Sequence, residues 1–166
     1  MRTNGSAIGW GVLGPGRIAR SFATDLLLVE DGDLVATGSR SLERAEEFNQ
    51  ECAGPAGARA YGSYEELVAD PAVEAIYIAS PHSEHARQSI LAIQAGKPVL
   101  VEKSFTQTAE QARVVRELGC DKGQGWFFGK PMEGPALALW LASRSPALAA
   151  PCRIAETERA RAVEAS

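Results

Sequence analysis

A glycine-rich turn near the start of the chain has the residue types and the spacing that suit a bound diphosphate. Residues 14–19 read GPGRIA and fit the pattern G-x-G-x-x-A, with an apolar run before them and a helical pattern after them. In that context Gly14 permits the tight turn, Gly16 lets the backbone approach a pyrophosphate, and Ala19 keeps the helix close to the sheet. The turn therefore predicts a dinucleotide site.

The other residues of this turn would supply the hydrogen-bond donors. The amides of Arg17 and Ile18 would face the phosphates at the positive end of the helix dipole. Pro15 removes one donor but presets the turn, because its φ is fixed. The alternative interpretation is a glycine turn that joins a strand to a helix and binds nothing.

The end of the second predicted strand indicates which dinucleotide would bind. An acidic side chain there would hold a free ribose 2′-hydroxyl, whereas Ser39 and Arg40 offer a hydroxyl and a guanidinium suited to a 2′-phosphate. We therefore expect NADP rather than NAD. The alternative is a solvent-exposed arginine in front of a helix, since surface arginines are common.

Two later strand ends complete the candidate site. Residues 80–85, SPHSEH, and 101–105, VEKSF, fall where parallel strands deliver side chains to the edge at which ligands bind. Lys103, if desolvated beside a nicotinamide, would exchange a proton with a substrate hydroxyl while a hydride moves. The cofactor-binding candidates at these two strand ends are Ser80, Pro81, His82, His85, Glu102 and Lys103.

Each of these later residues also has a structural interpretation. A lysine at a strand end can lie along apolar surface with its ammonium in water, and His82 or His85 can be a helix-cap or surface group. A metal site is not expected, because the only two histidines of the chain are here with no cysteine nearby in sequence.

Composition excludes several classes of partner and compartment. The formal charge of −4 and the pI near 5.3 give no basic field for nucleic acid or an anionic membrane. The three cysteines, Cys52, Cys120 and Cys152, are odd in number and form no CxxC, which favours a reducing compartment over a disulfide framework. No apolar run reaches membrane-spanning length and no secretory signal is visible, so we expect a cytoplasmic protein.

The elements that must position these residues alternate between strand and helix. Apolar runs at 8–13, 34–38, 75–80 and 98–103 predict buried parallel strands. The helix after the glycines should bury a stripe made of Ile18, Ala19, Phe22, Ala23 and Leu26, and the next should run from Ser41 to about Cys52 with Leu42, Ala45 and Phe48 inward. The fold class expected is α/β, a Rossmann-like doubly wound parallel sheet.

Capping residues set the ends of the later helices. Capping boxes at 63–66 and 108–111 each predict a helix start, and the Asp70-Pro71 pair should end the first of these helices. Another helix opens near Ser83 and carries Ile90, Leu91 and Ile93. Gly96 and Gly119 occupy left-handed stop positions at the ends of helices.

Four of these stretches, in this order and spacing, resemble the nucleotide-binding half of the glucose-fructose oxidoreductase, inositol dehydrogenase and MocA family, and within it the NADP-dependent D-xylose and dihydrodiol dehydrogenases. The match covers residues 8 to about 108, with the stretches GWGVLGPGRIARSF, ATGSRSLERAEEF, YGSYEELVADPAVEAIYIASPHSEH and AGKPVLVEKSF. The resemblance implies a Rossmann domain whose glycine turn holds the pyrophosphate and whose Ser39-Arg40 meets the adenosine phosphate. It also implies that Lys103, the lysine of a Glu-Lys-Pro motif, is catalytic, with Ser104 in place of the proline that often belongs to an unusual peptide geometry.

Too few residues follow for the second, substrate-binding domain of such enzymes, so we expect this chain to lack it. Instead, residues 108–132 resemble the closing segment of EAL-type cyclic-di-GMP phosphodiesterases, without that family's signature or metal-binding carboxylates. We therefore expect a dinucleotide-binding domain at 1–118, an added strand (125–128) and helix (135–143) from another fold within 119–145, and a polar tail at 146–166 that is either a frayed helix or disordered. If the added strand and helix do not cover an edge of the sheet, their aromatic residues would form an exposed apolar patch that favours self-association. The residues of this patch would be Trp126, Phe127, Phe128 and Trp140.

These observations support three functional hypotheses. The first is an NADP-binding domain of an oxidoreductase that transfers hydride between NADP and a sugar or diol, truncated by the loss of the second domain. The second is a nucleotide-binding module without catalysis, or a non-functional fusion whose pocket is blocked. The third is a cyclic-di-GMP receptor that acts through the tail.

Overall fold

The structure is a computed structural model, and it describes residues 7–120. The chain divides into two units, Met1–Leu118 and Gly119–Ser166. The predicted strand at 125–128, the helix at 135–143, the tail from 146 and the apolar patch all lie outside the described residues. All the described strands and helices belong to the first unit.

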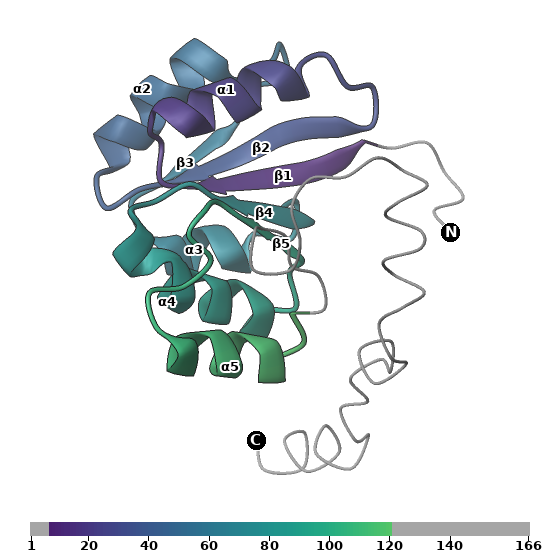
Figure 1. The fold of residues 1–166 in the computed structure, drawn as a ribbon. Helices are drawn as coiled ribbons and strands as arrows, with labels where there is room; N and C mark the ends of the chain where they lie inside the picture. Colours follow the sequence, from purple (N-terminus) through teal and green to yellow (C-terminus); the bar gives the residue numbers. More distant parts are fainter. Residues whose placement is uncertain (1–6, 121–166) are drawn as a thin grey trace, which may run out of the picture. The chain divides into compact units, whose positions relative to one another are not determined.

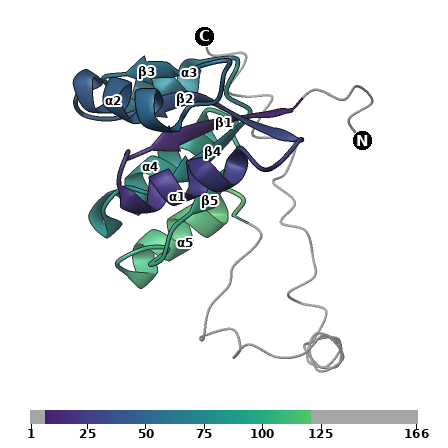
Figure 2. The ribbon, with the colours of Figure 1, turned by 90° about the horizontal axis from the view of Figure 1, so that it is seen from above.

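Five parallel strands form one sheet in the order β3-β2-β1-β4-β5, which Figure 2 shows across the molecule. All four neighbouring pairs run parallel. Their bounds are β1 Ile8–Leu13, β2 Gly32–Gly38, β3 Arg59–Tyr61, β4 Ala75–Ile78 and β5 Val99–Val101. The sheet is therefore the predicted Rossmann-like one.

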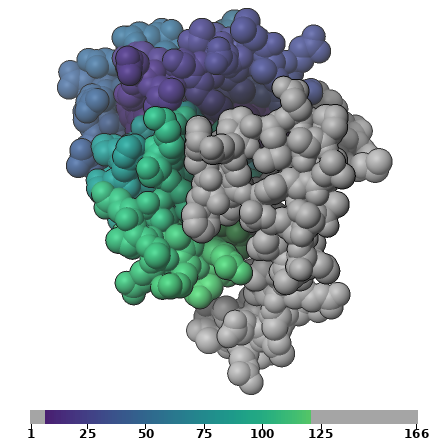
Figure 3. All heavy atoms as spheres, in the orientation of Figure 1, coloured from purple at the N-terminus to yellow at the C-terminus, as the bar shows by residue number. Residues whose placement is uncertain are grey.

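Helices cover both faces of this sheet (Figure 1). On one face lie α1 (Arg17–Leu26) and α2 (Leu42–Cys52), and on the other lie α3 (Tyr64–Ala69) and α4 (His82–Gln94). The last helix, α5 (Ala109–Glu117), packs against α4 and buries Val115. Figure 3 shows the two layers as spheres, purple to blue for α1 and α2 and teal to green for α3 to α5.

The two faces of the sheet have separate apolar cores because side chains alternate along each strand. In β1, Val12 belongs to the core under α1 and α2, and its neighbour Leu13 belongs to the core under α3 and α4. In β4, Tyr77 joins the first core and Ile78 the second. A large apolar side chain buried in this way stabilises the fold by about 1.5–3 kcal/mol. Both faces are therefore needed for stability.

Local capping chemistry fixes the helix ends as predicted. The hydroxyls of Ser41, Ser63 and Thr108 accept hydrogen bonds from the amides of the third residue of α2, α3 and α5. Each such cap contributes about 1 kcal/mol. Gly96 and Gly119 have φ of 73° and 104° and stop α4 and α5 in the left-handed conformation.

The structure corrects several expectations about which side chains face inward. Ile18 and Leu42 are each 48% exposed, because they stand in the first two residues of their helices, before the part that packs on the sheet. The short strand β3 was not predicted, since three residues are too few to show a period. In α4 the buried residues are His85, Ala86, Gln88, Ser89 and Ala92, three of which are polar, while Ile90, Leu91 and Ile93 are only half-buried.

None of the helices within residues 7–120 is long and apolar enough to span a membrane.

Candidate functional site

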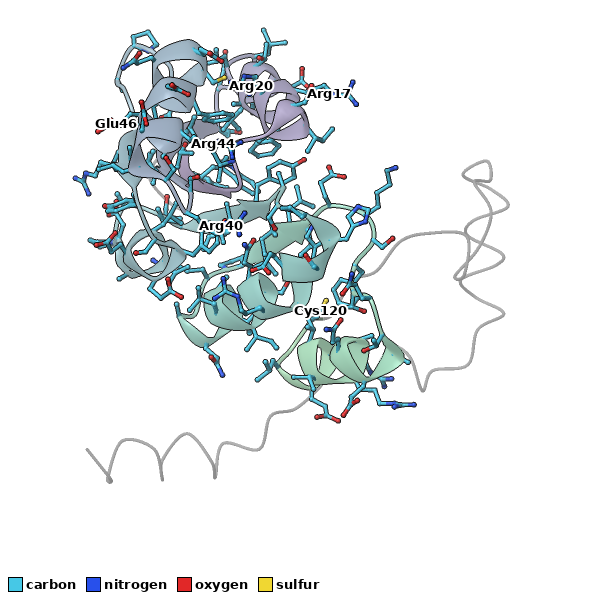
Figure 4. All side chains as sticks on the ribbon, turned by 90° about the vertical axis from the view of Figure 1, so that its left-hand side faces the viewer. Arg17, Arg20, Arg40, Arg44, Glu46 and Cys120 are labelled. Atoms are coloured by element: carbon cyan, nitrogen blue, oxygen red, sulfur yellow. The ribbon has the colours of Figure 1, made fainter. Side chains whose placement is uncertain are left out.

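The predicted site residues gather at the edge where the parallel strands end. Gly14, Ser39, Ser80 and Glu102 follow the last residues of β1, β2, β4 and β5 closely. Figure 4 views the molecule from the side on which this edge lies. The crossover after β1 leads to β2, whereas β4 pairs with the other side of β1, so the strand order reverses between β1 and β4. That reversal is where open α/β sheets bind ligands.

Gly14 makes the tight turn that the sequence predicted. Its φ is +87°, and a Cβ on this residue would lie 2.7 Å from Cα of Ser80. Its amide donates to the carbonyl of Gly38 at 3.1 Å. The turn is therefore held against the last residue of β2 and against the segment that follows β4, and only glycine fits there.

The fold does not require a glycine at position 16, neither for the backbone conformation there nor to avoid contacts with the rest of the protein. Its φ of −108° and ψ of −172° are extended values that any residue adopts. A Cβ on Gly16 would meet only the carbonyl oxygen of Gly14, at 4.0 Å. The space beside this backbone is open, which is what close approach of a diphosphate needs.

Two helices begin at this edge without a side-chain cap. Of the five helices within residues 7–120, α1 and α4 have no hydrogen bond from an N-cap side chain, since their N-caps are Gly16 and Pro81. The amide of Gly16 donates to Gly14 at 2.8 Å, so it serves the turn and not a ligand. The first turn of α1 contains Arg17 and no acidic residue, the reverse of what the helix dipole favours. Both features suit an anion bound at the N-terminus of α1.

Three arginines on this edge make no ion pair with any described residue. Arg17 begins α1, Arg40 follows β2, and Arg44 lies in the first turn of α2; all three are exposed and labelled in Figure 4. By contrast, Arg20 is paired with Glu51 at 2.7 Å, and Arg59 is paired with Asp70 at 3.0 Å. The guanidinium groups of these three arginines are therefore without a carboxylate partner in the described part of the chain.

Two of the predicted serines point into the protein. Ser39 is 5% exposed, and its hydroxyl oxygen accepts from the amide of Ser41 at 3.3 Å. Ser80 is 7% exposed, and its hydroxyl donates to Oε1 of Gln88 at 2.7 Å. Both hydroxyls thus have partners inside the fold, and the exposed group at the end of β2 is Arg40.

His85 is fully buried and joins two strand ends. Its Nε2 lies 2.8 Å from the carbonyl oxygen of Ser80, and its Nδ1 lies 2.7 Å from that of Ser104. Because carbonyl oxygens only accept, each of these contacts requires an N–H on the ring nitrogen that makes it. His82 is exposed, and its ring meets that of His85 edge-on at 5.4 Å. The structure brings the two histidines together but leaves only His82 accessible.

The Glu-Lys pair follows β5 directly. Lys103 is exposed, and the peptide bond between Lys103 and Ser104 is cis. Glu102 is half-buried; its Oε1 accepts from the hydroxyl of Tyr77 at 2.6 Å, and its Oε2 accepts from the amide of Lys103 at 3.3 Å. The carboxylate is thus fixed while the ammonium stays in solvent.

Three residues near this edge were not predicted from the sequence as parts of the site. Arg44 could have been found, since it lies three positions after the helix cap Ser41 and hence on the first turn. Tyr77 and Gln88 gave no signal, because each resembles an ordinary core position within a strand or a helix. No group of three His, Cys, Asp or Glu residues within 7–120 is placed to hold a metal ion.

Comparison with known proteins agrees with this geometry. The sequence matches the profile of the Gfo/Idh/MocA oxidoreductase family, with an NAD-binding Rossmann fold, over residues 8–126. D-xylose 1-dehydrogenase (NADP(+)) of Hypocrea jecorina is 46% identical over 117 residues, 65% of this chain and 30% of the relative. Trans-1,2-dihydrobenzene-1,2-diol dehydrogenase of Bos taurus is 38% identical over 125 residues, 74% of this chain and 36% of the relative. The chain therefore spans about a third of the length of these curated relatives.

A solved structure shares the fold. The 3-ketoreductase KijD10 from Actinomadura kijaniata, in complex with NADP, superposes with a TM-score of 0.63 at 29% identity, over 68% of this chain and 35% of that one. The predicted Rossmann-like fold and the predicted family resemblance are confirmed. The resemblance of residues 108–132 to EAL-type phosphodiesterases gains no support, and the family match covers most of that segment.

Proposed function

Because this chain belongs to the Gfo/Idh/MocA oxidoreductase family and carries its nucleotide-binding Rossmann domain, we propose that it binds NADP at the carboxyl edge of the sheet. The observation that carries this proposal is the N-terminus of α1, which has no side-chain cap and begins beside the open space at Gly16. The amides of Arg17 and Ile18 would bind the pyrophosphate there.

The preference for NADP over NAD rests on charge. Arg40 follows β2, where an acidic residue would be needed to bind a free 2′-hydroxyl. Arg44 comes from the first turn of α2 at the same edge. Neither guanidinium has a carboxylate partner among the described residues, so both are free to bind a 2′-phosphate.

The proposed reaction is hydride transfer between NADP and a carbon of a sugar or diol. When bound, the nicotinamide supplies the hydride acceptor or donor. In its uncharged form, Nζ of Lys103 takes the proton from the substrate hydroxyl during oxidation, and it returns the proton during reduction. The side chain of Lys103 is exposed, so the water exclusion that this step needs must come from the bound ligands or from a covering domain.

A second candidate function is a nucleotide-binding module without catalysis. It is favoured by the exposure of Lys103 in the described part of the chain. Such a module would retain the binding edge of β1 and β2, where the glycine turn and the arginines lie. Substrate positioning can account for about 7–11 kcal/mol of a barrier, and a module without a substrate pocket lacks it.

Calorimetric titration of the full chain with NADPH and NADH tests the binding proposal. We expect NADPH to bind more tightly than NADH, and titration in which neither nucleotide binds would overturn the proposal. Incubation of the chain with NADP and a panel of aldoses and diols then separates the two candidates. An enzyme produces NADPH and loses this activity on Lys103→Ala, whereas a module binds NADP and produces none.

We also propose that the protein works in the cytoplasm. Cys52 is a buried free thiol, and burial raises its pKa, so the thiol stays protonated and inert. A buried structural thiol of this kind fits a reducing compartment. Microscopy of the fluorescently tagged protein in its host tests the location.

A further inference from the structure

Tyr77 joins the apolar core to the reactive end of the candidate site. It lies in β4 and is 4% exposed, and its ring stacks on Phe22 of α1 with centroids 4.1 Å apart. Phe22 in turn meets Trp10 of β1 edge-on at 5.3 Å. The ring of Tyr77 is therefore held by packing against α1, and its hydroxyl has little freedom to move.

The hydroxyl of Tyr77 leaves this core and meets a single partner. It donates to Oε1 of Glu102 at 2.6 Å, across 25 residues of sequence. Burial and the neighbouring carboxylate both raise the pKa of Tyr77, so the hydroxyl keeps its proton and remains a donor. The other oxygen of Glu102 accepts from the amide of Lys103 at 3.3 Å. A rigid tyrosine thus fixes one oxygen of a carboxylate that is bonded to the backbone of the candidate catalytic lysine.

The strand order places Glu102 on the nicotinamide side of the crevice. If the glycine turn after β1 holds the pyrophosphate and Arg40 after β2 holds the adenosine half, the other half must extend over β4 and β5. Glu102 follows β5 and is only half-buried. Each carboxylate oxygen has a second lone pair, so Glu102 can accept a further hydrogen bond while it keeps the one from Tyr77.

We propose that Tyr77 is a positioning residue, whose hydroxyl orients the carboxylate of Glu102 to accept a hydrogen bond from the nicotinamide half of the dinucleotide. This inference rests on the proposed NADP binding and adds a residue that does not itself touch the ligand. Tyr77 acts through Glu102, and the adenosine half lies on the opposite side of β1. Loss of the hydroxyl should therefore weaken the binding of one half of the ligand only.

The test compares two probes on the full chain by calorimetry. NADPH contains both halves, whereas 2′,5′-ADP lacks the nicotinamide half. Tyr77→Phe keeps the ring and its stacking but removes the donor. We expect the Kd for NADPH to rise about 3- to 10-fold, the usual effect of one lost hydrogen bond, and the Kd for 2′,5′-ADP to stay within about twofold.

A double-mutant cycle shows whether the effect passes through Glu102. In a Glu102→Ala background, Tyr77→Phe should change the Kd for NADPH by less than about twofold, because the acceptor that Tyr77 orients is gone. Glu102→Ala alone should weaken NADPH binding and spare 2′,5′-ADP binding, which tests the inference even if Tyr77→Phe does not fold. Tyr61→Phe is the matched control, since Tyr61 also donates its hydroxyl to a carboxylate, Asp70, at 2.9 Å, but outside the proposed site. This control should leave both Kd values unchanged.

Each other outcome is decisive. Equal weakening of both probes by Tyr77→Phe would show a purely structural role, and unchanged NADPH binding would show no role; either overturns the inference and leaves the proposed function standing. The same holds if the wild type binds NADPH and 2′,5′-ADP with equal affinity. If the wild type binds neither probe, the proposed function itself falls, and the inference falls with it.

Discussion

The backbone of Gly14 lies directly against that of Ser80, so that a Cβ on residue 14 would sit 2.7 Å from Cα and 2.8 Å from N of Ser80. The two residues follow neighbouring strands, β1 and β4, between which the order of the sheet reverses. This contact brings the glycine turn against the segment that carries the histidines. The candidate site therefore depends on close backbone packing as much as on its polar side chains.

Gly14→Ala should destabilise the whole domain. A φ of +87° costs an L-residue about 1–2 kcal/mol, and the added methyl collides with backbone that cannot move aside cheaply. We expect the free energy of unfolding to fall by about 2–5 kcal/mol in chemical denaturation, since overpacking adds about 1–3 kcal/mol. A loss below about 0.5 kcal/mol would show that the turn relaxes easily.

In contrast to Gly14→Ala, Gly16→Val should weaken the binding of NADPH and leave the stability of the domain nearly unchanged. Residue 16 is extended, and its Cβ would point into open space, so the free energy of unfolding should change by less than about 1 kcal/mol, the usual effect at an N-cap. Binding of NADPH, measured by calorimetry, should weaken at least about tenfold, because the side chain fills the space proposed for the pyrophosphate. Unchanged affinity would place the pyrophosphate elsewhere.

Arg40→Asp should change the preference for the nucleotide. The substitution removes a cation from the proposed 2′-phosphate site and supplies a carboxylate that can bind a free 2′-hydroxyl. We expect NADPH to bind about 10- to 100-fold more weakly, the usual effect of losing a charge-assisted hydrogen bond, and NADH to bind no worse. The matched control is Arg113→Asp, since Arg113 is also exposed and without an ion pair among the described residues, but lies on α5. Equal losses in both variants would indicate only a net-charge effect.

Asp70 should make the domain sensitive to acid. Burial alone would raise the pKa of Asp70, but hydrogen bonds from the amide of Ala72, from Tyr61 and from Arg59 outweigh it and lower the pKa below its ordinary value of 3.8. A lowered folded pKa gives stability that is complete above the unfolded value and is lost as the pH falls through the folded one. The free energy of unfolding should therefore fall as the pH drops below about 4.

Asp70→Asn separates this contribution from general acid unfolding. The variant should be less stable by about 1–3 kcal/mol at neutral pH, because a buried charged acceptor loses its partners. Its remaining stability should depend less on pH below 4 than that of the wild type, as measured by urea denaturation at several pH values. Parallel pH curves for the two proteins would assign the acid sensitivity to other groups.

The sequence alone determined the features that depend on neighbours along the chain. The strand of 8–13, the glycine turn, the caps Ser41, Ser63 and Thr108, and the alternating β and α segments all result from short-range rules, and each is present in the structure. Such features need only the local conformational preferences of the residues involved and a regular apolar period. The family resemblance rests on the same motifs, and the family profile confirms it.

Only the tertiary structure decided what each polar side chain at the strand ends does. It buried Ser39, Ser80 and His85 inside the fold and left Arg40 and Lys103 exposed, although all five lie in segments that follow strands. It also joined Tyr77 to Glu102 across 25 residues. These outcomes depend on which strands become neighbours and on how side chains fill the space between helix and sheet. Long-range packing sets both, and no local pattern encodes them.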